Sequence, residues 1–230
     1  PVGKGIKVLF APDSYGALSS TDAIKRLSVA ARRHFQGVKI VPVPMTYGGC
    51  GMVRALVTAC EGAYRTAKIT PLVPEGKSSA VYGVLHGKTA VLALAEVLPC
   101  EGEGTASLNA GELIRRALDE GLREIVLGTA ESAIRDCGMG CMRALGVKFY
   151  DAEGTELKGS AEELGRVAAV DTEYLHPGLR EARITILNGG ISETPAEYAE
   201  DAVRFRALVA SAVGVSASDC AGVGGLLCAL

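Results

Sequence analysis

The chain alternates short apolar runs with longer stretches in which apolar residues recur at helical spacing. Apolar runs bounded by turn-forming residues predict buried strands, here at 6–11, 38–43, 67–72, 79–85, 89–95, 124–127, 147–150 and 183–187. Amphipathic spacing predicts helices at 23–35 (with an N-cap in Ser19-Ser20-Thr21-Asp22), 52–60, 110–120 and 195–213. Because strands and helices alternate, we expect an α/β fold with a parallel or mixed sheet flanked by helices. Three consecutive strands between 67 and 95 indicate a smaller strand-rich lobe.

Two turns that follow predicted strands are rich in glycine and other small residues. The first is Gly48-Gly49-Cys50-Gly51, and the second lies within 128–146 and opens into a helix. A strand, a small-residue turn and a helix in succession can present backbone N–H groups to an anion. The glycines of the first turn either bind a ligand in this way or only permit positive φ angles, and the sequence leaves both interpretations open.

Composition and charge argue against several classes of protein. The 230 residues contain 24 basic and 26 acidic residues, well mixed, for a net charge of −2. No basic stripe indicates nucleic acid or an anionic membrane as a partner, and no apolar run is long enough to span a bilayer. Seven scattered cysteines without a CxxC pair indicate reduced thiols rather than disulfides or a zinc site. We therefore expect a cytoplasmic globular protein without a secretory signal.

Asp13 and Ser14 directly follow the first predicted strand, where α/β proteins place functional side chains. We predict that this pair is catalytic, with Asp13 acting as a base or a metal contact. The alternative is that Asp13 only forms a turn after Pro12. Cys50 suggests a nucleophile, but no histidine lies near it in the sequence.

The second turn offers polar groups for a substrate hydroxyl or a phosphate. Ser132, Asp136 and Gly138 are candidates for that contact, and Arg135 would add positive charge. The alternative is that Ser132 and Asp136 only cap the helix that follows, a common role for these residue types. Glu131 in the same turn would repel an anion, which favours this alternative or a different ligand.

Four stretches, in order along the chain, resemble motifs of the type I glycerate kinase family. These are Ala11-Pro12-Asp13-Ser14 (family APDSFK), Gly48-Gly49 with Gly51 (DGGEGT), Ser132-Ala133 with Asp136, Gly138 and Gly140 (GGSATNDGGAG), and Ala221-Gly222 with Gly224-Gly225-Leu226 (GAGAAGGLG). The resemblance therefore extends over nearly the whole chain.

The resemblance implies a glycerate-kinase-like α/β fold in which ATP phosphorylates a hydroxyl of glycerate in a cleft between two domains. It implies Mg-ATP as cofactor, Asp13 as the group that orients the hydroxyl, and the two glycine turns as holders of carboxylate and phosphates. We expect an incomplete Rossmann-like lobe from 1–66 with 214–230, and a second α/β lobe at 67–213. The expected partners are a small hydroxy acid or other small anion, and a second copy or a paralogue chain.

Many polar positions of these motifs differ in this chain. The lysine that follows APDSF in the family is replaced by Gly16. The Asp, Glu and Thr of DGGEGT are replaced by Tyr47, Cys50 and Met52. In GGSATND, Ala130-Glu131 replace the two glycines and Ile134-Arg135 replace Thr-Asn. The resemblance also implies truncation, because the family's VITGEGRLDGQT segment would follow the last residue. Since phosphoryl transfer depends on such charges, the alternative hypothesis is an inactive pseudoenzyme that binds a small anion or a partner chain.

Overall fold

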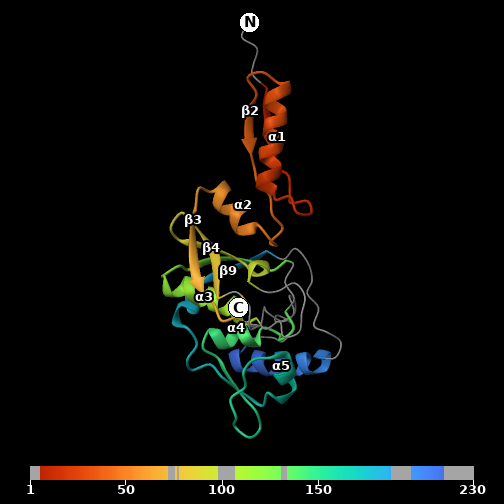
Figure 1. Cartoon of the computed structure of the whole chain (residues 1–230). Helices are drawn as coiled ribbons and strands as arrows, with labels where there is room; N and C mark the ends of the chain where they lie inside the picture. The colour runs from red at the N-terminus through yellow and green to blue at the C-terminus, as the bar shows by residue number, and fades with distance from the viewer. Residues whose placement is uncertain are drawn as a thin grey trace.

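The protein is organised as two units joined by the segment around residues 44–51. The computed structural model describes residues 6–71, 76, 78–97, 107–130, 134–187 and 198–214. A slender N-terminal unit stands apart from a larger unit that contains the remaining described elements, and α2 lies where the two meet (Figure 1). Within these described ranges, no helix is long and apolar enough to cross a membrane.

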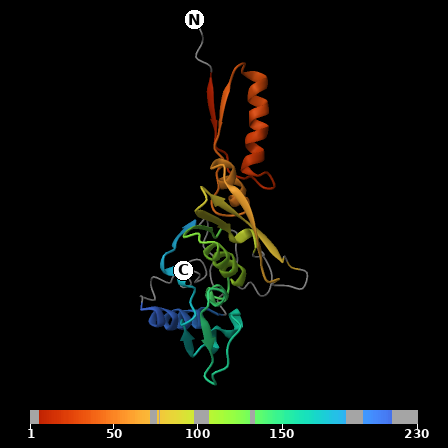
Figure 2. The same cartoon turned by 90° about the vertical axis from the view of Figure 1, so that its left-hand side faces the viewer.

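The N-terminal unit is a β-α-β element. Strand β1 (Lys7–Phe10) pairs in parallel with β2 (Lys39–Pro42), and helix α1 (Ser20–His34) connects them. Figure 2 shows α1 along one side of the two strands. Exposure alternates along β1, and Leu9 is 61% exposed. The two-stranded sheet is therefore covered on one face only, and the predicted elements at 6–11, 23–35 and 38–43 are confirmed.

The larger unit is built on a mixed five-stranded sheet with the order β3-β4-β5-β6-β9. Its strands are β3 (Ala63–Lys68), β4 (Ser79–Leu85), β5 (Thr89–Ala93), β6 (Glu124–Gly128) and β9 (Arg183–Leu187). The pairs β3–β4 and β4–β5 are antiparallel, whereas β5–β6 and β6–β9 are parallel. The carboxyl ends of three parallel strands therefore share one edge of the sheet.

Helices cover both faces of this sheet. On one face, α2 (Met52–Ala59) packs Met52 and Val53 among apolar side chains of β4 and β5. On the other face, α3 (Leu108–Asp119) packs Leu113 and Ile114 against the sheet, with the short helix α4 (Met139–Ala144) beside it. This arrangement confirms the predicted α/β fold with a mixed sheet flanked by helices.

A small cluster of elements adjoins α4. Strand β7 (Lys148–Tyr150) pairs with β8 (Ala169–Asp171), and α5 (Ala199–Val213) packs Phe205 against Phe149 with ring centroids 5.5 Å apart. Short 3-10 helices complete the described chain: η1 (Leu94–Glu96), η2 (Ala161–Arg166) and η3 (Pro177–Arg180). Strand β8 was not predicted, because three partly exposed residues carry no alternating apolar signal.

Strand β3 shows where the apolar pattern misleads. The sequence predicts a strand at 67–72, whereas β3 spans 63–68 and lies at the edge of the sheet. Its first residues are exposed and partly polar, so they form no apolar run. The domain boundary expected after residue 66 falls inside this strand, and α2 packs with the larger unit. The residues 214–230 expected to join the first lobe lie outside the described residues, except Gly214.

Candidate functional site

A small pocket lies where the two units meet, beyond the carboxyl ends of β1 and β2. Asp13 and Ser14 line it from the loop after β1, and Cys50 and Gly51 line it from the start of α2. Hydroxyl groups dominate the remaining wall, contributed by Ser19, Ser20, Thr21 and Thr46. The pocket holds about 20 Å³, room for about one water molecule. A ligand larger than a water molecule therefore does not fit this pocket unless its walls move.

Ser20 fixes the two loops that form the pocket. Its hydroxyl donates to the Pro12 carbonyl at 2.7 Å and accepts from the Met45 backbone N–H at 3.0 Å. Since these residues follow β1 and β2 respectively, one buried hydroxyl ties both strand exits to the start of α1. Next to it, the Asp13 carboxylate accepts from the backbone N–H of Ser14 at 2.7 Å. Asp13 remains exposed, so its carboxylate is accessible to a ligand.

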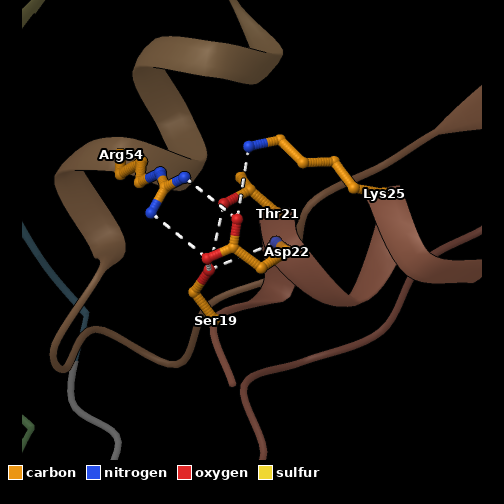
Figure 3. Close-up of polar contacts among 5 residues, drawn as sticks. All are labelled: Ser19, Thr21, Asp22, Lys25 and Arg54. Atoms are coloured by element: carbon orange, nitrogen blue, oxygen red, sulfur yellow. Dashed lines mark hydrogen bonds and ion pairs between the residues drawn. The ribbon is translucent and has the colours of Figure 1, made fainter. Parts of the chain in front are cut away.

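A charged cluster joins α1 to α2 beside the pocket (Figure 3). The Asp22 carboxylate accepts from the Ser19 hydroxyl at 2.6 Å and pairs with Lys25 at 3.3 Å. The guanidinium of Arg54 reaches the same carboxylate from α2, with Nη2–Oδ1 3.2 Å and Nη1–Oδ2 3.4 Å. The Ser19 cap, followed by Lys25 and Arg54, holds the pKa of Asp22 below its ordinary value. The contacts of the ionised Asp22 therefore stabilise the folded protein at pH values above its ordinary pKa. This stabilisation is lost as the pH falls through the lowered pKa.

The turn at Gly48 sits directly on the edge of the large sheet. Gly48 has φ +96°, and a Cβ atom there would lie 2.5 Å from the carbonyl oxygen of Leu187, the last residue of β9. A Cβ on Gly128, the last residue of β6, would collide with the Gly48 carbonyl oxygen. Glycine is needed at position 48 because of this close approach as well as its φ angle. The contact places the turn over the carboxyl ends of β6 and β9.

Asp136 is the centre of a second, fully buried network. Its carboxylate accepts from the Ser107 N–H at 2.7 Å, the Ser107 hydroxyl at 3.0 Å, the Gly138 N–H at 3.1 Å and the Gly140 N–H at 3.0 Å. Burial raises the pKa of Asp136, and the four donors oppose that rise. The carboxylate thus joins the start of α3 to the turn before α4, and it has no exposed surface for a ligand.

The structure gathers only part of the predicted site around the pocket. Asp13, Ser14 and Gly51 line it together, and the buried Gly48 and Gly49 belong to the same turn. In contrast, the described residues that line it do not include Arg135, Asp136 or Gly138. Ser132 lies outside the described residues. A ligand-binding role for these residues of the second turn stays a prediction.

Several pocket residues were not predicted as functional. Ser19, Ser20 and Thr21 were interpreted only as part of the N-cap of a helix, and Thr46 was not considered. The run of three hydroxyl residues before a predicted helix was the signal available in the sequence. Among the residues that the structure describes, no group of three or more His, Cys, Asp or Glu side chains is placed to hold a metal ion.

Fold and pocket together define an α/β protein of two units, with its candidate site between them at the carboxyl ends of parallel strands. Residues 8–189 match the sequence model of the glycerate kinase family. The chain belongs to the glycerate kinase family, as its motifs indicated.

Relatives and a solved structure agree with this assignment. The chain is 35% identical to glycerate 2-kinase of Escherichia coli K12 over 191 residues, covering 79% of this chain and 50% of the relative. It is 29% identical to glycerate kinase of Bacillus subtilis 168, with the same coverage. A crystal structure of a protein assigned as glycerate kinase 2 from Salmonella typhimurium LT2 matches 99% of this chain and 69% of its own, with TM-score 0.82 and 27% identity. The chain thus spans about half the length of the curated relatives it matches.

Proposed function

We propose that this chain contributes to the transfer of a phosphoryl group from ATP to a hydroxyl of a small hydroxy acid such as glycerate. The observation that carries the proposal is the position of Asp13 and Ser14, at the end of β1 and in a pocket walled by hydroxyl groups. Enzymatic phosphoryl transfer depends mainly on positioning and on stabilising charge. A pocket fixed by the loops of two strands suits that requirement.

Asp13 is the residue best placed to act on the attacking hydroxyl. Its carboxylate is exposed and is held by the Ser14 N–H, so it can accept a hydrogen bond from a substrate hydroxyl and orient it. Magnesium-bound ATP supplies the phosphoryl group. Asp13 would also be a fitting contact for the ion, because Mg²⁺ in such sites takes one or two protein carboxylates alongside phosphate oxygens.

A second candidate function is binding of a small anion or a partner chain without turnover. The observation that favours it is the chemistry of three residues near the pocket, Gly16, Tyr47 and Cys50, none of which brings a fixed charge. The resemblance gave charged residues at all three positions. With fewer charges to stabilise a transferring phosphoryl group, the protein would still bind its ligand but would lose catalytic rate.

Replacing Asp13 by Asn separates these functions. With Mg-ATP and D-glycerate, we expect the purified chain to release ADP, and Asp13→Asn to lower that rate at least roughly 100-fold, as loss of a positioned proton acceptor does. The measurement is glycerate-dependent ADP release in a coupled assay. Asp119→Asn is the matched control, since Asp119 is an exposed carboxylate on α3, outside the pocket lining.

The outcomes distinguish the two functions. Turnover that survives in Asp119→Asn and disappears in Asp13→Asn supports the phosphotransferase. Equal rates for Asp13→Asn and the unchanged chain would contradict the role given to Asp13. Absence of glycerate-dependent turnover together with measurable glycerate binding would favour the second function.

A further inference from the structure

The pocket needs a cation if its ligand is an anion, and Arg54 is placed to provide it. Arg54 lies on the first turns of α2, between Gly51 and Ala55, both of which line the pocket. Its guanidinium meets Asp22, and Asp22 in turn meets Ser19, a further lining residue. Two successive hydrogen bonds, Arg54 to Asp22 and Asp22 to Ser19, therefore connect the guanidinium to the wall of the pocket (Figure 3).

The contacts of Arg54 leave donors for a ligand. A guanidinium carries five N–H groups in a planar fork that matches a carboxylate. The Asp22 carboxylate accepts one hydrogen bond from Nη1 and one from Nη2. The Arg54 side chain is 47% exposed, so the fork is held in place and is still open to solvent.

Other charges around the pocket make this cation important. Asp13 and Asp22 are both acidic and would repel an incoming carboxylate, and position 16 is a glycine with no side chain to offset them. Lys25 also pairs with Asp22, but its side chain is 70% exposed. Both residues lie on α1, so this pair does not connect the two units. Arg54 instead comes from the larger unit and meets the N-terminal unit across their junction.

We propose that Arg54, which does not itself line the pocket, is the specificity-determining residue that pairs with the carboxylate of the small hydroxy acid, while Asp22 holds the guanidinium beside the lining residue Ser19. This inference rests on the proposed function and names the group that would select an acid over a neutral alcohol. Because the cation and the hydroxyl groups come from different units, ligand binding would also hold the units together.

Calorimetric titration of the full chain with D-glycerate, and with glycerol as the uncharged probe, tests the inference. We expect Arg54→Gln to weaken glycerate binding by about tenfold or more, the usual effect of losing a charge-assisted hydrogen bond. Arg54→Lys should restore part of the affinity because it keeps the charge. Lys25→Gln is the matched control, and its affinity should stay within about twofold of the unchanged chain, as exposed pairs contribute little. If turnover is observed, Arg54→Gln should raise KM more than it lowers kcat.

Each result supports or overturns a stated claim. Selective loss of glycerate affinity in Arg54→Gln, with partial rescue in Arg54→Lys and an unchanged melting temperature, supports the inference. Equal glycerate affinity in Arg54→Gln and the unchanged chain overturns it and leaves the proposed function standing. If the unchanged chain prefers glycerol or binds neither probe, the proposed function fails together with the inference.

Discussion

Replacing Asp136 by Ala is expected to lower the free energy of unfolding by about 4 kcal/mol, because several buried donors lose their acceptor at once. The carboxylate accepts from three backbone N–H groups, of Ser107, Gly138 and Gly140, and from the Ser107 hydroxyl. None of these groups can turn to water, since Asp136 and Ser107 are both fully buried. The start of α3 would therefore separate from the turn before α4.

A graded series makes this expectation specific. Asp136→Asn keeps one oxygen for the donors that contact Oδ2, but its amide NH₂ would face the Gly138 N–H that contacts Oδ1. We therefore expect the free energy of unfolding to fall by about 2 kcal/mol. Asp119→Asn, at a side chain that is 51% exposed, should change stability by less than about 0.5 kcal/mol. Urea unfolding followed by circular dichroism gives all three values. A loss for Asp136→Ala no larger than that of Asp119→Asn would show that the network adds nothing to stability.

Gly48→Ala is expected to destabilise the protein by about 3 kcal/mol, through steric collision added to backbone strain. A Cβ at position 48 would lie 2.5 Å from the Leu187 carbonyl oxygen, and this backbone atom cannot move without shifting β9. The turn would lift from the sheet, and Gly51 with the pocket wall would move with it. We therefore expect weaker glycerate binding as well as lower stability.

Gly51→Ala separates the two causes. Gly51 also has a positive φ, +81°, but a Cβ atom there would meet nothing within 4 Å. It should cost only the strain of the left-handed conformation, about 1 kcal/mol. Thermal or urea unfolding of both variants measures the difference. Equal losses for the two variants would mean that the close approach at Gly48 relaxes without cost.

The fold could be predicted where both faces of a strand are covered. Strands β5 and β6 are apolar runs because most of their residues are buried, and the sequence located both. It also located the edge strand β9 from its apolar side chains, although the residues of β9 are exposed or only partly buried. Strand β3 was misplaced because an edge strand exposed to water needs no apolar run. Its pairing partner β4 determines where it begins, and that pairing is not visible in the spacing of residues.

The pocket lining could be predicted only where it follows from local sequence. Asp13 and Ser14, which line the pocket, were singled out because they directly follow an apolar run. The pair of Arg54 with Asp22 joins residues 32 positions apart, and that of Ser107 with Asp136 joins residues 29 apart. Nothing in linear spacing connects such partners, because the packing of α1 on α2 and of α3 on α4 brings them together.

The thin sheet of the N-terminal unit has a consequence for how the pocket forms. Two paired strands with one face open to water are marginally stable alone, whereas the five-stranded sheet is packed on both faces. The backbone amides of β1 and β2 should therefore exchange with solvent at a lower opening free energy than those of β5 and β6. Asp13 and Ser14 belong to that easily opened part, so a ligand that contacts both units must order it on binding. Its apparent affinity will be reduced by the fraction of molecules in which the unit is open.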